Sequence, residues 1–298
     1  MLKIRDNTRI FTFFSKRFKY TMANITAADV NKLRQMTGAG MMDCKHALQE
    51  SEGDFEKAVD YLRKKGQKVA NKRADKEANE GIVLASTNDA HTFGIVARIN
   101  CETDFVAKNA EFIDLAKTFQ SKALAAGIKD KEAALKLDIN GRTLEENLTE
   151  LIGKTGEKME LSGYEAIEGP VVASYNHMGN RLATIVAFSK EVSNGVELAH
   201  EIAMQVAAMN PVAVDANSVD ASTIKREIEI GMEQARAEGK PENMLEKIAQ
   251  GKLNKFFKDN TLLNQEFIRD SKKTVAQYLT GFDSELTVTA FKRLQLGE

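Results

Sequence analysis

The chain has 298 residues, of which 43% are hydrophobic and 29% charged, with 42 basic and 43 acidic side chains. This composition is typical of two or three globular domains and excludes an intrinsically disordered chain. No apolar run is long enough to cross a membrane, and the near-neutral charge gives no electrostatic case for nucleic acid as a partner. Only two cysteines are present, Cys44 and Cys101, which excludes a disulfide framework and fits a reducing compartment.

The first 21 residues differ from the rest in charge. They contain six basic residues and one acid, and without them the formal charge changes from −1 to −6. Such a segment is either an organellar transit peptide, which would place the protein in an organelle matrix, or a stretch upstream of a true start at Met22. We favour the second alternative, because Met22 leads directly into a helix-capping sequence. Residues 1–21 are therefore expected to lie outside the mature fold of a cytoplasmic protein.

Residues 22–66 predict a module of three short helices. Thr26 and Asp54 are suitable caps for the first and third helices, and Gly38 and Gly40 separate the first from the second. The apolar residues expected in its core are Val30, Leu33, Leu48, Val59 and Leu62. A core of this size is marginal for about forty residues, so the expected role of the module is docking on a partner. The third helix is expected to end at Lys65.

The rest of the chain predicts an α+β fold with an internal repeat. A polar, lysine-rich linker at 67–79 is expected first, as a solvated helix or a tether without a site. Gly81–Ser86 is then echoed by Gly169–Ser174, and Ile95–Ala97 by Ile185–Ala187. The repeat predicts two related α+β subdomains, whose expected ranges are 80–156 and 157–298.

Four further elements are predicted within the second subdomain. Two amphipathic helices form a pair at about 221–257, either as a protruding hairpin or as a bundle packed on the core. The pattern after them predicts a helix at 274–279 and a strand at 286–294 that returns to the core.

The stretch from Asn100 to Ala107 is the candidate site. An apolar strand precedes it, and Thr103 or Asp104 can cap the helix that follows. In a continuous helix, Phe105 would lie on the buried face with Phe112. A break at Asn109 would instead free Phe105 to point away from the core, and the spacing leaves both alternatives open.

No group of residues predicts catalysis or a cofactor. The sequence Leu148–Thr155 ends like a phosphate-binding loop but lacks its first glycine, and Gly153 is interpreted as a helix stop. The four histidines show no metal-ligand spacing with one another or with the cysteines. Cys44 and Cys101 are most simply small buried hydrophobic residues, although a thiol enzyme that uses Cys101 remains an alternative. A binding protein is therefore favoured over an enzyme.

Two motifs of the sequence resemble the bacterial-type elongation factor Ts family. They are Leu33–Lys45 and Thr103–Ala107, and the resemblance extends from about Met22 to the C-terminus, including Ile202–Ala208 and Ser271–Val275. The family fold implies that the first three helices form a ubiquitin-associated-like module and that the helical pair protrudes.

The resemblance implies a guanine-nucleotide exchange factor that binds elongation factor Tu, both with GDP and without nucleotide. By resemblance, Phe105 wedges between helices of the nucleotide domain of that partner, and Asp104 disturbs the surroundings of its magnesium ion. Thr103 and Val106 complete the motif. Exchange needs only tighter binding to the nucleotide-free partner, so no catalytic group is required. The alternative function is a peptide- or ubiquitin-like-binding adaptor without exchange activity.

The resemblance also assigns the helical module a contact. Arg34, Met41 and Met42 match positions that touch the nucleotide-binding domain of elongation factor Tu. No cofactor, membrane or direct nucleic acid contact is implied, and oligomerisation is possible. Gln205 stands where many relatives have His, which leaves open whether its helix contacts the partner.

Overall fold

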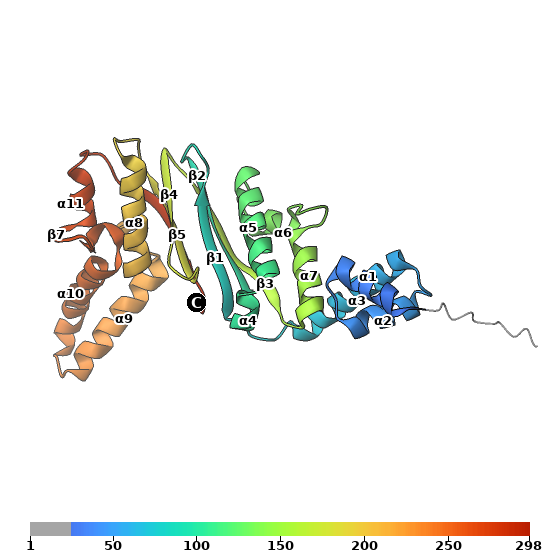
Figure 1. The fold of residues 1–298 in the computed structure, drawn as a ribbon. Helices are drawn as coiled ribbons and strands as arrows, with labels where there is room; N and C mark the ends of the chain where they lie inside the picture. Colours follow the sequence, from blue (N-terminus) through green and yellow to red (C-terminus); the bar gives the residue numbers. More distant parts are fainter. Residues whose placement is uncertain (1–24) are drawn as a thin grey trace, which may run out of the picture. The chain divides into compact units, whose positions relative to one another are not determined.

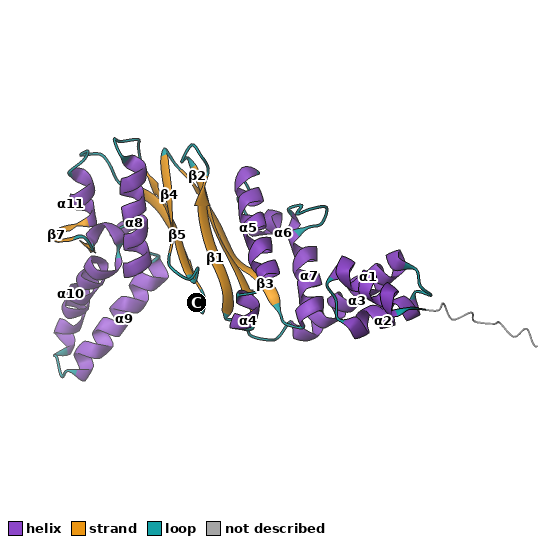
Figure 2. Cartoon of the chain, viewed as in Figure 1, coloured by secondary structure: helices purple, strands orange, loops and turns teal. Residues whose placement is uncertain are grey.

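The computed structural model describes residues 25–298, so the prediction for residues 1–21 lies outside the described part of the chain. Two compact units are present, one up to Lys64 and one spanning Lys65–Glu298 (Figure 1). Helices and strands are both abundant, which confirms the predicted α+β class (Figure 2). Within the described residues, no helix has the length and apolar character needed to cross a membrane.

The first unit consists of two helices and the first half of a third. Their bounds are α1 Ala27–Thr37, α2 Met41–Glu50 and α3 Phe55–Arg73. Thr26 and Asp29 form a capping box at the start of α1, and Gly38 ends it in the left-handed conformation with φ 68°. Val30, Leu33 and Leu48 are buried, while Val59 and Leu62 pack against them partly buried. The remaining buried members of this core are Ala39, Cys44, Ala47 and Ala58.

Helix α3 extends well beyond its expected end at Lys65. It continues to Arg73, so about half of the expected linker at 67–79 is helical, and the boundary between the two units falls within this helix. Its last turns are not merely solvated, because Val69 and Ala70 pack against the core of the second unit. Burial of these two side chains explains the longer helix, since a helix is stabilised mainly by packing of its apolar side.

The second unit begins with a three-stranded antiparallel sheet in the order β1-β2-β3. The strands are β1 Glu80–Thr87, β2 Phe93–Cys101 and β3 Met159–Glu168, and the helices between β2 and β3 are α4 Asp104–Ala107, α5 Ala110–Ala125, α6 Lys131–Lys136 and α7 Leu144–Thr155. Eight of the nine residues of β2 are buried, as expected for the central strand of a sheet. Because β3 pairs with β2, the expected boundary between residues 156 and 157 separates this strand from its own sheet.

The remaining elements surround a second antiparallel sheet, in the order β4-β5-β8. Its strands are β4 Val171–Asn176, β5 Leu182–Phe188 and β8 Val288–Gln295, and the other elements are helices α8 Gly195–Met209, α9 Ala221–Ala237, α10 Glu242–Asn260 and α11 Val275–Thr280, strands β6 Glu266–Phe267 and β7 Asp270–Thr274, and the 3-10 turns Ala216–Ser218 and Leu262–Asn264.

The two sheets lie between two layers of helices (Figure 1). Helix α5 covers the outer face of the first sheet with Phe112, Ala116 and Phe119, and α8 covers the outer face of the second with Leu198 and Ile202. Between the sheets lies a third cluster, to which both contribute; its members include Val83, Val96, Ile167, Val172 and Ile185. The halves are therefore joined by a common core.

The interpretation of Gly153 as a helix stop is wrong. Helix α7 continues to Thr155 and ends at Gly156, which is left-handed with φ 75°. A Cβ on Gly153 would lie 2.9 Å from the Cα of Gly66 in α3, and a Cβ on Gly66 would lie 3.0 Å from the carbonyl oxygen of Thr149. Gly153 is thus a contact point at which two helix backbones approach closely.

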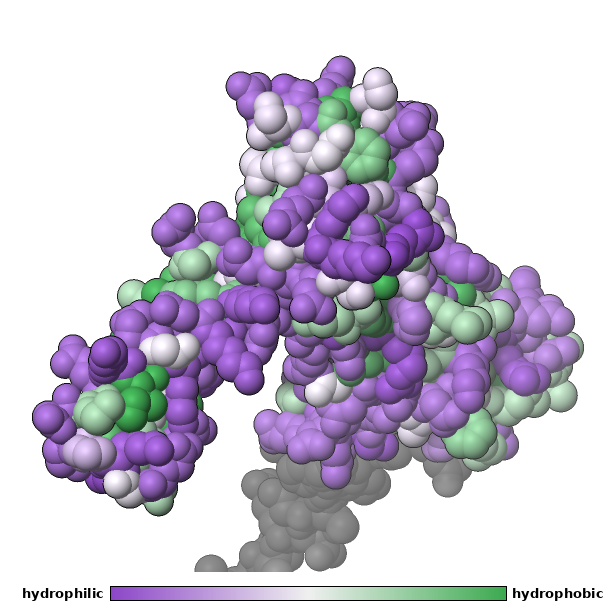
Figure 3. Space-filling view, turned by 90° about the vertical axis from the view of Figure 1, so that its left-hand side faces the viewer, coloured by the Kyte–Doolittle hydropathy of each residue, from purple (hydrophilic) through white to green (hydrophobic). Residues whose placement is uncertain are grey.

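Helices α9 and α10 form the predicted pair and project from the rest of the second unit (Figure 3). They approach most closely at Gly231, where an added Cβ would lie 3.1 Å from the Cα of Ala249. Ala235, Leu245 and Leu253 fill the rest of the seam. The face of the pair visible in Figure 3 is mostly hydrophilic, with a few apolar residues along it.

Gln205 is a fully buried side chain within α8. Its amide nitrogen donates to the carbonyl oxygen of Glu266 at 3.1 Å, and its amide oxygen accepts from the backbone N–H of Ile268 at 2.8 Å. A buried amide with paired oxygen and nitrogen stabilises the fold. Gln205 therefore fastens the turn between β6 and β7 to α8, and the side chain itself is not exposed for binding.

Candidate exchange site

A short helix bounded by two caps presents the candidate residues. Thr103 caps α4, its hydroxyl oxygen accepting from the N–H of Val106 at 3.4 Å. Asn109 caps α5, its side-chain oxygen accepting from the N–H of Glu111 at 2.8 Å. Each cap has extended backbone geometry, so helical rotation is interrupted between α4 and α5. The break at Asn109 is confirmed, and the continuous helix is wrong.

The two neighbouring apolar residues of α4 have opposite environments. Val106 is 7% exposed and belongs to the core beneath the first sheet, whereas Phe105 is 83% exposed. Val106 therefore anchors the short helix, and its burial leaves the adjacent side chain directed outward. A large aromatic side chain at this exposure contributes little of the free energy that its burial in the core would provide. This geometry supports a role for Phe105 outside the chain's own core.

Asp104 lies beside Phe105 and carries an exposed charge. Its carboxylate accepts from the ammonium group of Lys108 at 2.6 Å, one helical turn further on. This hydrogen bond, followed by the charge of Lys108, lowers the pKa of Asp104. The carboxylate is therefore ionised at neutral pH, and the site presents an acid and an aromatic ring together.

The backbone before α4 is held by carboxylates. Glu157, just after α7, accepts from both the N–H and the hydroxyl of Thr103, at 3.1 and 2.8 Å. Glu102 accepts from the N–H of Lys158 at 2.6 Å and from the guanidinium of Arg73 at 2.9 Å. Sequence reasoning missed Glu157, because 54 residues separate it from Thr103. Only the pairing of β2 with β3 brings the two together.

The residues assigned to docking lie in the first unit, whereas Thr103–Val106 lie in the second. Arg34 is exposed on α1. Met41 and Met42, in the first turn of α2, are 47% and 63% exposed, so neither contributes to the core. Met36 is also 60% exposed and was not singled out from the sequence, although it lies within the same motif. Exposed methionines are adaptable apolar contacts for a partner.

Neither cysteine has the environment of a reactive thiol. Cys44 and Cys101 are both fully buried, as expected from the sequence. The Cys101 thiol donates to the carbonyl oxygen of Thr103 at 3.2 Å. Burial, together with the charges of Glu157 and Glu80, raises its pKa to about 12. Because the thiolate is the nucleophile, Cys101 is inert at neutral pH.

We expect Cys101→Ser to leave nucleotide exchange within about twofold of wild type. The hydroxyl can keep the bond to Thr103, while loss of the buried sulfur should cost about 1 kcal/mol in the free energy of unfolding. Exchange kinetics and urea unfolding measure the two effects separately. A loss of exchange of more than about tenfold with unchanged stability would favour the thiol enzyme.

The described residues also offer no metal centre: no three of their His, Cys, Asp or Glu side chains are grouped to hold a metal ion. Two exposed features remain. One is the aromatic ring of Phe105 beside the carboxylate of Asp104 on α4, and the other is the set of exposed methionines in the first unit. Exposed apolar and charged side chains of this kind are typical of a surface that binds another protein.

Comparison with known proteins identifies the family. Residues 102–298 match the family model described as elongation factor TS. The chain is 53% identical to elongation factor Ts of Christiangramia forsetii over 276 residues, covering 93% of the chain and all of that relative. It is 52% identical to elongation factor Ts of Porphyromonas gingivalis, covering 91% and 98%, and 41% identical to that of Bacteroides fragilis, covering 91% and 98%. The chain belongs to the elongation factor Ts family, whose members are nucleotide exchange factors of translation elongation and not enzymes.

Proposed function

We propose that the chain promotes GDP release from elongation factor Tu by means of Phe105 and Asp104. The observation that carries this proposal is the 83% exposure of Phe105 on a helix whose neighbour Val106 is buried. The ring would enter the nucleotide domain of the partner, and the carboxylate of Asp104 would disturb the surroundings of its magnesium ion. A GTPase holds nucleotide through phosphate contacts and this ion, so both actions weaken GDP binding.

The first unit supplies a second contact in this proposal. Arg34, Met41 and Met42 dock on the nucleotide-binding domain of elongation factor Tu, and their exposure supports this role. The two subdomains and the protruding pair provide the scaffold that presents Phe105. The partner is bound both with GDP and without nucleotide, and the setting is the cytoplasm of a bacterial-type translation system.

The direct test is GDP release from purified elongation factor Tu loaded with a fluorescent GDP analogue. Sub-stoichiometric chain should release the whole bound nucleotide, because an exchange factor dissociates after each cycle. Stoichiometric release, or none, would contradict exchange and favour an adaptor.

We expect Glu229→Lys, on α9, to leave exchange on a single partner nearly unchanged. Glu229 is an exposed residue that forms an ion pair with Lys225 at 3.9 Å. Surface substitutions of this kind seldom change the free energy of unfolding by more than about 0.5 kcal/mol. The same GDP-release assay measures it. Severe loss of exchange in a variant with an unchanged melting temperature would place the helical pair in the main interface.

A further inference from the structure

The short helix α4 does not determine its own orientation. It contains four residues, too few to be stable by itself, and Phe105 makes little contact with the rest of the chain because it is 83% exposed. The direction of the ring is therefore fixed through the backbone of Thr103 and the burial of Val106. Whatever holds Thr103 also positions Phe105.

Glu157 holds Thr103 through two atoms at once. One carboxylate oxygen accepts from the backbone N–H at 3.1 Å, and the other accepts from the hydroxyl at 2.8 Å. The hydroxyl oxygen accepts in turn from the N–H of Val106. A bond to an ionised acceptor is stronger than one between neutral groups, and linked bonds polarise one another. Glu157 therefore strengthens the cap of the helix that carries Phe105.

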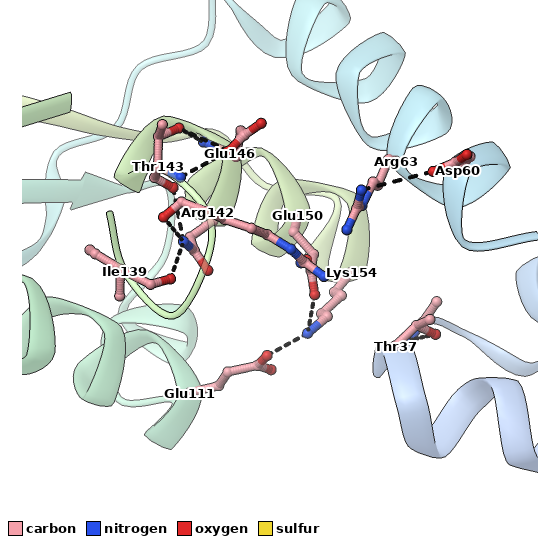
Figure 4. Close-up of polar contacts among 12 residues, drawn as sticks. Thr37, Asp60, Arg63, Glu111, Ile139, Arg142, Thr143, Glu146, Glu150 and Lys154 are labelled. Carbon is pink, nitrogen blue, oxygen red and sulfur yellow. Dashed lines mark hydrogen bonds and ion pairs between the residues drawn. The ribbon is translucent and has the colours of Figure 1, made fainter. Parts of the chain in front are cut away.

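The position of Glu157 is itself fixed from both sides. Before it, Lys154 of α7 pairs with Glu111 of α5, and at 3.2 Å it also pairs with Glu150 of its own helix (Figure 4). After it, Met159 opens β3 opposite Cys101. Glu102 returns the interaction by accepting from the N–H of Lys158. Each segment thus supplies a carboxylate that accepts from a backbone N–H of the other. We call this reciprocal pair of hydrogen bonds between residues 102–103 and 157–158 the clasp.

We propose that Glu157 is a positioning residue for nucleotide exchange, acting through Thr103 on the direction of Phe105. This inference rests on the proposed function of Phe105 and adds to it a residue outside the Thr103–Ala107 motif. Glu157 need not touch the partner for this role. Its removal should loosen α4 while the sheet and α5 remain in place.

The test is a double-mutant cycle between Glu157→Ala and Phe105→Ala, measured as GDP release from elongation factor Tu. Glu157→Ala alone should slow release about tenfold, the effect of losing a charged double hydrogen bond. In the Phe105→Ala background, the same substitution should slow release by less than about twofold, since no ring remains to be positioned. Equal effects in the two backgrounds would overturn the inference.

Amide hydrogen exchange of the free chain measures the clasp without the partner. Glu157→Ala should speed exchange at Thr103 and Val106 by at least about tenfold, while the strands exchange as in wild type. Unchanged protection at both amides would overturn the inference, as would a fall in melting temperature that accounts for the lost activity.

Two further variants sharpen the result. Glu157→Gln should restore release to within about threefold of wild type, because the amide can accept from the N–H and donate to the hydroxyl oxygen of Thr103. Glu168→Ala, which removes a carboxylate from the far end of β3 where it pairs with exposed Lys129, should release GDP as wild type does. If Phe105→Ala by itself does not slow GDP release, the proposed function is wrong. If Phe105→Ala slows release but the effects of the two substitutions are additive, only the role of Glu157 is wrong.

Discussion

Phe105→Ala should slow GDP release from elongation factor Tu by up to about a hundredfold and leave the fold of the chain intact. A fully buried aromatic ring contributes about 2–3 kcal/mol by apolar area, which corresponds to that factor. The ring is exposed in the free chain, so this energy is gained only when the partner binds. Its loss should therefore affect exchange and not the free energy of unfolding.

Stopped-flow release of a fluorescent GDP analogue measures the effect, with a melting curve of each variant alongside. Asp104→Asn is the matched comparison: it keeps the size of the side chain and removes the charge that Lys108 stabilises, so it should do less than Phe105→Ala. Release at the wild-type rate by Phe105→Ala, or a loss explained by melting, would show that the ring has no role in exchange.

Linkage adds a second measurement to the same experiment. Whatever factor the bound chain removes from the affinity of the partner for GDP, GDP removes from the affinity of the partner for the chain. Phe105→Ala should reduce both factors equally. The four binding equilibria form a closed cycle, so unequal factors would mean that one of the measurements had not reached equilibrium.

The sequence predicts those elements whose signals are local. Caps at Thr26 and Thr103, the apolar stripe of α5 and the apolar run of β2 each lie within one element, so periodicity and capping chemistry identify them. The outward direction of Phe105 was left open by spacing alone. The break at Asn109 separates α4 from α5, and the burial of Val106 together with the bonds of Thr103 then directs Phe105 outward. A sequence displays neither the backbone conformation at Asn109 nor these contacts.

The features that were missed depend on contacts between distant segments. Apolar and polar residues alternate only weakly along strand β3, where Met159 and Leu161 are buried and most of the other residues are half-buried. Pairing with β2, rather than its own sequence pattern, therefore makes this segment a strand. Gly153 lies inside α7 because the backbone of Gly66, 87 residues earlier in the chain, comes too close to leave room for a side chain. Glu157 and Thr103 are likewise brought together only by the fold.

Removal of residues 1–64 should weaken binding to elongation factor Tu by at least about tenfold, since a few docking side chains commonly carry most of an interface's energy. The first unit has its own core, formed by Leu33, Leu48 and their neighbours, and the second unit begins at Lys65. The shortened chain should therefore retain the circular dichroism and the cooperative melting of its sheets.

The boundary of the deletion is critical, because the second half of α3 belongs to the second unit. Removal of residues 1–79 also deletes Val69 and Ala70, which pack against the core of the first sheet. It deletes Arg73 as well, which pairs with Glu102 next to Thr103. This longer deletion should lower the melting temperature and should slow GDP release even at saturating concentrations of the shortened chain. The deletion of residues 1–64 should mainly raise the chain concentration that is needed for half-maximal release. Titration of release rate against chain concentration separates the two effects. Equal loss of folding and of binding in the 1–64 deletion would contradict a docking role and make the first unit part of the structural core.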